Sequence, residues 1–105
     1  MQPIEFYFDP ISPFAYLGSI QIERVAKKLD RPVDWKPVLI GITILKVMGL
    51  KPLPQTPLKG PYLKRDAVRL AEYFDIPFRY HGLTGINSLA ALRAFVALKE
   101  RDPAI

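Results

Sequence analysis

Apolar and polar residues alternate near the start of the chain. From Ile4 to Phe8 the sequence reads IEFYF, so the isoleucine and both phenylalanines fall on one side, with Glu5 and Tyr7 on the other. A period of two is typical of a β-strand with one buried face. The Asp-Pro dipeptide that follows ends the pattern, because proline cannot donate to a strand ladder. We therefore predict a strand over residues 4–8.

A helical period begins after this strand. Ser12 has the position of an N-cap, and Pro13 that of the first helical residue, where its missing N–H costs nothing. The spacing predicts a helix from Pro13 to about Lys28. Gly18 is unfavourable inside a helix, so we expect it to permit the close approach of a neighbouring element. One apolar face of this helix should cover a sheet, and it contains Phe14, Gly18, Ile22, Val25 and Leu29.

A second alternating run, Val33 to Pro37, predicts a strand that ends near Pro37. Strand, helix and strand in this order form a βαβ unit with parallel strands. Two strands are few for such a sheet, which usually has four or more strands and both faces covered. We therefore expect the chain to be the first part of a larger α/β domain, or to complete its sheet with another copy.

The middle of the chain predicts helices joined by a proline-rich connection. Ile42 to Met48 indicates one or two helical turns, stopped by Gly49. Repeated prolines between residues 50 and 61 predict a loop. A helix resumes at Pro61, and its apolar face contains Leu63, Ala67, Leu70, Ala71 and Phe74.

The end of the chain predicts a loop and a last helix. Phe78 to Ile86 has no clear period, so we predict a loop there. Asn87 or Ser88 should cap a helix that runs to about Arg101. Its predicted buried stripe contains Leu89, Leu92 and Val96.

Composition narrows the class of protein. The chain has 105 residues, 50% of them hydrophobic and 24% charged, as in a soluble globular domain. The apolar run from Val38 to Leu45 is shorter than the roughly 20 residues of a membrane helix, and no secretory signal is evident, so we expect a cytoplasmic protein without a membrane partner. The net charge of +5 suits an anionic small molecule as well as a nucleic acid, or no charged partner at all, so its sign alone decides little. Basic residues are spread along the chain, so we expect no nucleic-acid partner.

The chain contains no cysteine. This excludes structural disulfides and any thiol nucleophile supplied by the chain itself. We expect no metal site, because histidine and carboxylate residues do not cluster. His81 is the single histidine and no Gly-x-Ser-x-Gly motif is present, so a histidine-activated serine nucleophile is not expected.

A few polar residues could carry chemistry. Ser12 opens a helix after a parallel strand, where free N–H groups and the helix dipole favour an anion. A bound thiol would ionise more readily there, although a Ser-Pro pair at a helix start is more often only a structural cap. Asp34 and Lys36 share a strand face, either as a solvated edge or as a site for a substrate carboxylate. Lys59 ends the proline-rich loop and could hold an anion.

Three stretches in order resemble the 2-hydroxychromene-2-carboxylate isomerases and the related kappa-class glutathione transferases; they read FYFDPISPFAYLG, WKPVLIG and KGPYLKRDAVRLAEYFDIPF. The resemblance implies a thioredoxin-like α/β fold of the DsbA type, which contains an inserted helical domain. It implies that residues 1–40 form the thioredoxin-like βαβ portion and residues 41–105 a linker and the first inserted helices. Only the N-terminal part of the family is matched, so the fold should be incomplete here.

The resemblance also implies glutathione as the cofactor. In redox members a Cys-x-x-Cys motif opens the first helix, and here SPFA stands in that place. The family's serine at this position hydrogen-bonds the glutathione sulfur, so Ser12 is the implied catalytic residue. The implied glutathione-binding residues are Ser12, Pro13 and Lys59, and those for a small aromatic-derived carboxylate are Lys36 and Phe14.

The implied reaction is a cis–trans isomerisation in aromatic catabolism, by reversible addition of a thiolate to a conjugated double bond. A kappa-like glutathione transferase is the nearest alternative, and a non-catalytic thioredoxin-like interaction module or inactive fragment is the other. We expect uncovered apolar faces to drive assembly into a homo-oligomer such as a dimer. We also expect the isolated chain of 105 residues to bind glutathione poorly.

Overall fold

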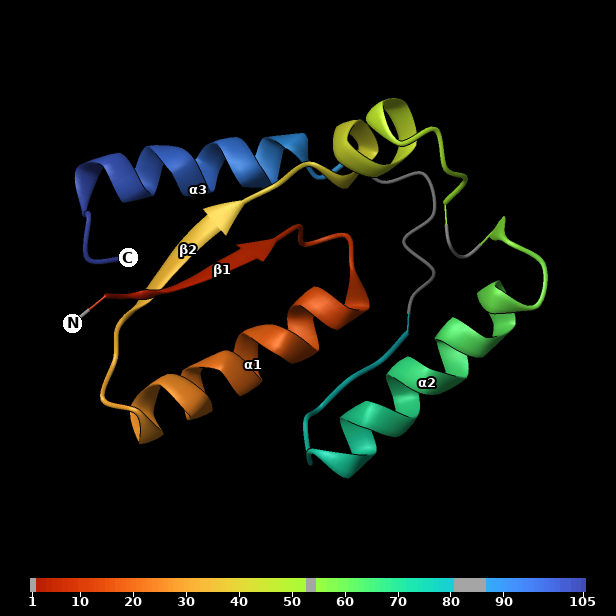
Figure 1. Ribbon diagram of the computed structural model, residues 1–105, viewed down its shortest axis with the longest axis horizontal. Helices are drawn as coiled ribbons and strands as arrows, with labels where there is room; N and C mark the ends of the chain where they lie inside the picture. Colours follow the sequence, from red (N-terminus) through yellow and green to blue (C-terminus); the bar gives the residue numbers. More distant parts are fainter. Residues whose placement is uncertain (1, 53–54, 81–86) are drawn as a thin grey trace. The chain divides into compact units, whose positions relative to one another are not determined.

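The computed structural model describes residues 2–52, 55–80 and 87–105. Within these ranges the elements follow the order β1 (Ile4–Phe8), α1 (Pro13–Lys28), β2 (Val33–Pro37), η1 (Gly41–Val47), α2 (Lys59–Tyr73) and α3 (Leu89–Arg101), as Figure 1 shows. The chain divides into two compact units: the first contains Met1–Leu39 and Asn87–Ile105, and the second contains Ile40–Ile86.

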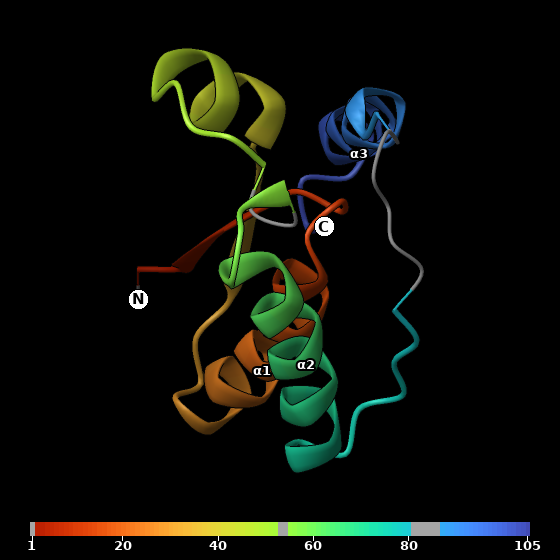
Figure 2. The ribbon, with the colours of Figure 1, turned by 90° about the vertical axis from the view of Figure 1, so that its right-hand side faces the viewer.

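The first unit is built on a parallel pair of strands. β1 and β2 lie side by side with Phe6 opposite Trp35. Beyond Pro37, the Val38 N–H donates to the Phe8 carbonyl oxygen at 2.8 Å and extends the pairing by one bond. α1 connects the two strands and lies along them (Figures 1 and 2). The predicted βαβ unit is therefore confirmed, with the predicted bounds of the first strand and of its helix.

Aromatic side chains fill the apolar face of this sheet. The rings of Phe6 and Phe8 each meet the Trp35 ring edge to face, with centroid distances of 5.2 and 5.9 Å. This geometry is favourable because the positive edge of one ring meets the negative face of another. A Cβ atom at Gly18 of α1 would lie 3.3 Å from Cζ of Phe6. The predicted close approach at Gly18 is thus confirmed, with Phe6 as the neighbour.

The predicted apolar face of α1 is wrong at two positions near its end. Val25 and Leu29 are 44% and 53% exposed, whereas Ala26 is 4% exposed. The row that turns inward follows Gly18, Ile22 and Ala26, four residues apart. Because such a row is inclined to the helix axis, the buried side of α1 shifts gradually around the helix from its start to its end. Val25 and Leu29 lie on the neighbouring row and face outward.

In the second unit, the helical turns predicted between Ile42 and Met48 form η1, which is a π-helix. Gly49 follows with a φ of +67°, a left-handed conformation that favours glycine. The predicted helical turns and their glycine stop are therefore confirmed.

α2 begins at Lys59, two residues before the predicted start at Pro61. Proline is tolerated in the first turn because the N–H groups there have no acceptor within the helix. The apolar face of this helix is largely as predicted, since its buried residues include Leu63, Ala67 and Ala71.

α3 packs against β2 within the first unit (Figure 1). Leu92 is buried, as predicted, and the ring of Phe95 meets that of Phe8 edge to face at 5.0 Å. Val96 was predicted to be buried, but this is wrong, since it is 42% exposed. The inward face continues from Phe95 to Lys99 instead, because β2 offers the lysine ammonium an acidic partner.

The start of α3 is capped by a side chain. The Leu89 N–H donates to Oδ1 of Asn87 at 3.0 Å, whereas the Ser88 hydroxyl makes no capping bond. Ser88 therefore occupies the N-cap position, and the side-chain hydrogen bond comes from Asn87, one residue before it.

The grouping of α3 with the strands differs from the expected division at residue 40. That expectation assigned residues 41–105 to a linker and an inserted helical domain, but residues 87–105 are grouped with residues 1–39. The contacts of Phe95 and Lys99 with the strands explain the difference, since the pattern of α3 alone does not identify its neighbour. The inserted domain itself stays a prediction.

Part of the predicted loop from Phe78 to Ile86 lies outside the described residues, and so does His81. In the described parts of the chain, no helix combines the length and the apolar character needed to span a bilayer.

Candidate functional site

A tight turn connects β1 to α1 and holds Ser12. Asp9 is only 1% exposed, and its Oδ1 accepts the N–H of Ile11 at 3.1 Å. The Asp9 carbonyl oxygen accepts the N–H of Ser12 at 3.0 Å. Aspartate favours such turns because its carboxylate reaches the backbone two residues further on. The turn thus sets the direction in which Ser12 enters α1.

Ser12 is the N-cap of α1, as predicted. Its backbone is extended, with φ −88° and ψ 124°, and its Oγ accepts the N–H of Ala15 at 3.3 Å. A hydroxyl that accepts through its oxygen still has its hydrogen to donate. The first turn of α1 contains no acidic residue, so no carboxylate of that turn offsets the positive end of the dipole. Ser12 can therefore cap the helix and donate to an anion together.

Pro13 and Phe14 occupy the first two positions of α1, next to Ser12. All three residues are half-buried. The structure thus brings these predicted site residues together at the start of one helix, where they are accessible to a small ligand.

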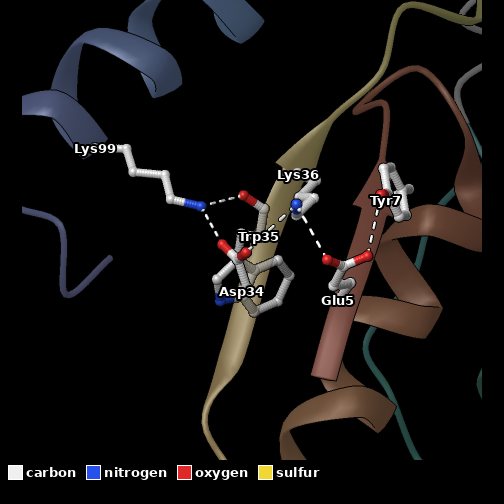
Figure 3. Close-up of polar contacts among 6 residues, drawn as sticks. All are labelled: Glu5, Tyr7, Asp34, Trp35, Lys36 and Lys99. Carbon is white, nitrogen blue, oxygen red and sulfur yellow. Dashed lines mark hydrogen bonds and ion pairs between the residues drawn. The ribbon is translucent and has the colours of Figure 1, made fainter. Parts of the chain in front are cut away.

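The polar face of the sheet carries a cluster of charged side chains, shown in Figure 3. Nζ of Lys36 lies 3.2 Å from Oε1 of Glu5 and 3.7 Å from Oδ2 of Asp34. The Tyr7 hydroxyl donates to Oε2 of Glu5 at 3.1 Å, and the Lys36 ammonium lies 5.9 Å from the centre of the Tyr7 ring. The prediction that Asp34 and Lys36 share a strand face is confirmed.

Lys99 of α3 joins this cluster from a distant part of the sequence. Its Nζ donates to Oδ1 of Asp34 at 2.5 Å and to the carbonyl oxygen of Trp35 at 2.6 Å (Figure 3). Sequence reasoning missed Lys99, which is 65 residues away from Asp34. A lysine in the last turn of a helix usually faces solvent and interacts favourably with the helix dipole. The residues next to Lys99 in the sequence therefore do not identify its partner.

The ion pairs of the cluster shift two pKa values. The hydrogen bond from Lys99 lowers the pKa of Asp34 below its ordinary value of 3.8, against an opposing effect of desolvation. The hydrogen bond to Glu5, together with its charge, raises the pKa of Lys36 above its ordinary value of 10.5. Both groups are therefore charged at neutral pH.

Lys36 lies on the face of the sheet opposite to the one that α1 approaches at Gly18. α1 approaches the face that carries Phe6, through Gly18. Lys36 follows Trp35 in β2, and successive side chains of a strand point to opposite faces. The structure therefore places Lys36 with Glu5 and Asp34, and not with the side chains that cover Phe6.

Lys59 is the first residue of α2 and belongs to the second unit. Its predicted contact with glutathione stays a prediction. Within the described ranges, no three histidine, cysteine or acidic side chains gather as metal ligands.

Several curated proteins are similar to this chain. Glutathione S-transferase kappa 2 of Caenorhabditis elegans is 28% identical over 104 residues, which cover 94% of this chain and 46% of that protein. Glutathione S-transferase kappa 1 of Homo sapiens is 28% identical over 105 residues, or 95% of this chain and 46% of that protein. The chain thus spans about half the length of these relatives.

A bacterial relative has a different named activity. The 2-hydroxychromene-2-carboxylate isomerase of Pseudomonas sp. (strain C18) is 28% identical over 75 residues, which cover 70% of this chain and 35% of that protein. Both protein classes named by the sequence resemblance are therefore found among the relatives.

The family comparison covers almost the whole chain. Residues 3–105 match the DSBA-like thioredoxin domain, a range that includes both strands and every helix described above. This match, together with the βαβ unit, confirms the predicted α/β class. The chain belongs to the DsbA-like thioredoxin domain family.

Proposed function

We propose that this chain provides the Ser12 part of a glutathione site in an isomerase of the 2-hydroxychromene-2-carboxylate type. The main support is the geometry of Ser12. Its Oγ accepts the Ala15 N–H at 3.3 Å, so the hydroxyl hydrogen can still be donated to a sulfur atom. This chain has no cysteine and so supplies no reacting sulfur of its own. Glutathione is the thiol in the names of the kappa relatives.

A glutathione thiol at the start of α1 meets two favourable features: the Ser12 hydroxyl and the positive end of the helix dipole. Each stabilises the thiolate more than the thiol, so the pKa of the bound thiol falls. In this proposal Pro13 contacts glutathione and Phe14 contacts the substrate ring. Lys59 supplies a cation for a glutathione carboxylate, and Lys36 binds the substrate carboxylate.

The proposed reaction returns glutathione unchanged. The hemiketal ring of the substrate first opens: its C–O bond breaks, which frees the phenol and a ketone conjugated with the double bond. The thiolate then forms a C–S bond to the carbon of that double bond remote from the ketone, and the π-electron pair moves to the ketone oxygen. The former double bond is then a single bond and rotates. When the electron pair returns, the double bond forms again in its other geometry and the C–S bond breaks.

A kappa-like glutathione transferase is the second candidate. It is favoured by coverage, since the two kappa relatives match 94% and 95% of the chain and the isomerase 70%. In that reaction the thiolate attacks an electrophile and stays bonded to the product, so Ser12 has the same role. A non-catalytic interaction module is the third candidate, and it predicts no saturable glutathione binding.

Titration of the full-length protein with glutathione tests the proposal. We expect saturable binding by calorimetry and the ultraviolet absorption of a bound thiolate at neutral pH. Ser12→Ala should retain binding but lose the thiolate absorption. Ser19→Ala is the matched control, because the Ser19 hydroxyl donates to the Tyr16 carbonyl within the same helix, away from its first turn. Absence of saturation would exclude both enzyme candidates.

Turnover distinguishes the two enzyme candidates. The isomerase should convert 2-hydroxychromene-2-carboxylate without consuming glutathione, whereas the transferase should consume one glutathione for each aryl halide converted. Glutathione consumption without isomerisation would favour the transferase.

We also propose that the protein forms a homo-oligomer. Support comes from apolar residues left exposed on α1 and α3, among them Leu29 and Leu98 at 53% and 54%. Size-exclusion chromatography with light scattering should give a mass above that of one chain. A concentration-independent monomer would contradict this proposal.

A further inference from the structure

The charged cluster of the polar face is neutral as a whole. It consists of the carboxylates of Glu5 and Asp34 and the ammonium groups of Lys36 and Lys99. Its contacts differ in length: Lys99 is 2.5 Å from Asp34 and Lys36 is 3.2 Å from Glu5, but Lys36 is 3.7 Å from Asp34. Asp34 is therefore neutralised chiefly by Lys99 and only weakly by Lys36.

The two lysines of the cluster differ in what they can still bind. Lys99 is committed to two acceptors on β2, since it donates to Asp34 and to the Trp35 carbonyl oxygen. Lys36 has its short contact with Glu5, and its side chain is 36% exposed. An ammonium group has three donors, so Lys36 has the capacity for a further carboxylate from solution.

We propose that Lys99 is a positioning residue for carboxylate binding by Lys36. By holding Asp34 and cancelling its charge, Lys99 leaves Lys36 able to accept the carboxylate of a small aromatic acid. This inference rests on the proposed function, in which Lys36 binds the substrate carboxylate. Without Lys99, two carboxylates face one ammonium group, so the cluster carries one excess negative charge. Asp34 then pairs with Lys36. An incoming carboxylate is repelled by the excess negative charge, and the Lys36 ammonium has fewer donors left for it.

The test is a titration of the full-length protein with 2-hydroxybenzoate, followed by the NMR signals of the Lys36 side chain. We expect Lys99→Met to weaken binding about three- to fivefold, the scale of one half-exposed charge contact. Asp34→Asn in the same background should restore the affinity, because it removes the excess negative charge. Lys99→Arg keeps the charge and should bind as the wild type does.

Lys28→Met is the matched control for overall charge. Lys28 is exposed in the last turn of α1, and its replacement changes the net charge of the protein by the same amount. We expect it to leave the affinity for 2-hydroxybenzoate unchanged.

Two results would overturn the inference and leave the proposed function in place. One is equal affinity in the wild type and in Lys99→Met. The other is a loss in Lys99→Met that Asp34→Asn does not restore, since Lys99 would then act through the packing of α3 on β2. If the wild type does not bind 2-hydroxybenzoate, or Lys36→Met binds it equally well, the carboxylate role of Lys36 fails and the inference fails with it. Glutathione binding reports on Ser12 separately.

Discussion

The two faces of the β1–β2 pair make different kinds of contact. On one face the phenylalanine rings of β1 meet Trp35 edge to face, and helices α1 and α3 contact the same rings. On the other face Glu5, Asp34 and Lys36 form half-exposed ion pairs. Apolar contact is stabilising because it removes area from water, whereas water screens exposed ion pairs and leaves them little net effect on stability.

This difference indicates a division of roles. The aromatic face holds the strands and helices of the first unit together, so changes there should affect folding. The polar face can exchange one charged partner for another at little cost in stability, which suits the binding of a ligand. Mutations that separate stability from binding can therefore test the contrast between the two faces.

The largest effect on stability is expected on the aromatic face. Phe6→Ala should lower the free energy of unfolding by about 3 kcal/mol, because it removes a ring that contacts Trp35 and underlies Gly18. Urea denaturation measures this change. Tyr7→Ala is the control on the polar face of the same strand, where the side chain is exposed, and should cost less than about 1 kcal/mol. Equal losses would contradict the proposed division of roles.

A second test adds volume to the aromatic face. Gly18→Val should destabilise the protein by about 1–3 kcal/mol, because a Cβ atom there already lies 3.3 Å from the Phe6 ring. Thermal denaturation gives the change. Gly41→Val is the control, since a Cβ atom at Gly41 meets no atom within 4 Å. A neutral Gly18→Val would show that the ring moves aside freely.

Ser12 lies on neither face, and its replacement should affect activity more than stability. Ser12→Ala should cost about 1 kcal/mol of stability as a lost cap. The loss in kcat should be on the order of a hundredfold, the usual effect of removing one donor to a developing or bound anion. Stopped-flow turnover and urea denaturation on the same samples give both values. Unchanged turnover would leave Ser12 with its capping role alone.

The smallest effect concerns the polar face and depends on pH. Since the pKa of Asp34 is lowered in the folded protein, the folded state binds a proton at Asp34 less tightly than the unfolded state does. The resulting stability is present above the ordinary value of 3.8 and is lost as the pH falls through the lowered pKa. Comparison of the wild type with Asp34→Asn by urea denaturation should show a difference at neutral pH that shrinks in acid. A difference that grows in acid would contradict this assignment.

Local signals were sufficient for much of the first unit. The period of two in β1, the Ser12-Pro13 start and the close approach at Gly18 all depend on residues next to one another or on one helix face. The bounds of β1 and α1 could be predicted for this reason. The start of α2 was predicted two residues late, because a proline is accepted both before a helix and within its first turn.

Burial along α1 and α3 was harder to predict. Val25, Leu29 and Val96 are apolar and fall near the expected stripes, yet all three are exposed. Which row of a helix is buried depends on the angle at which the helix crosses its neighbour, and that angle is a property of the assembled unit.

The sequence by itself determined the βαβ order, the capping serine and the absence of a thiol, since each follows from residue identity and short-range spacing. Only the tertiary structure decided that α3 returns to β2 and that Lys99 neutralises Asp34, a pairing across 65 residues. It also placed Lys36 on the face of the sheet opposite to Phe6, the ring that α1 approaches. Contacts of this kind depend on where the chain goes between two residues, and the local pattern of neither residue contains that information.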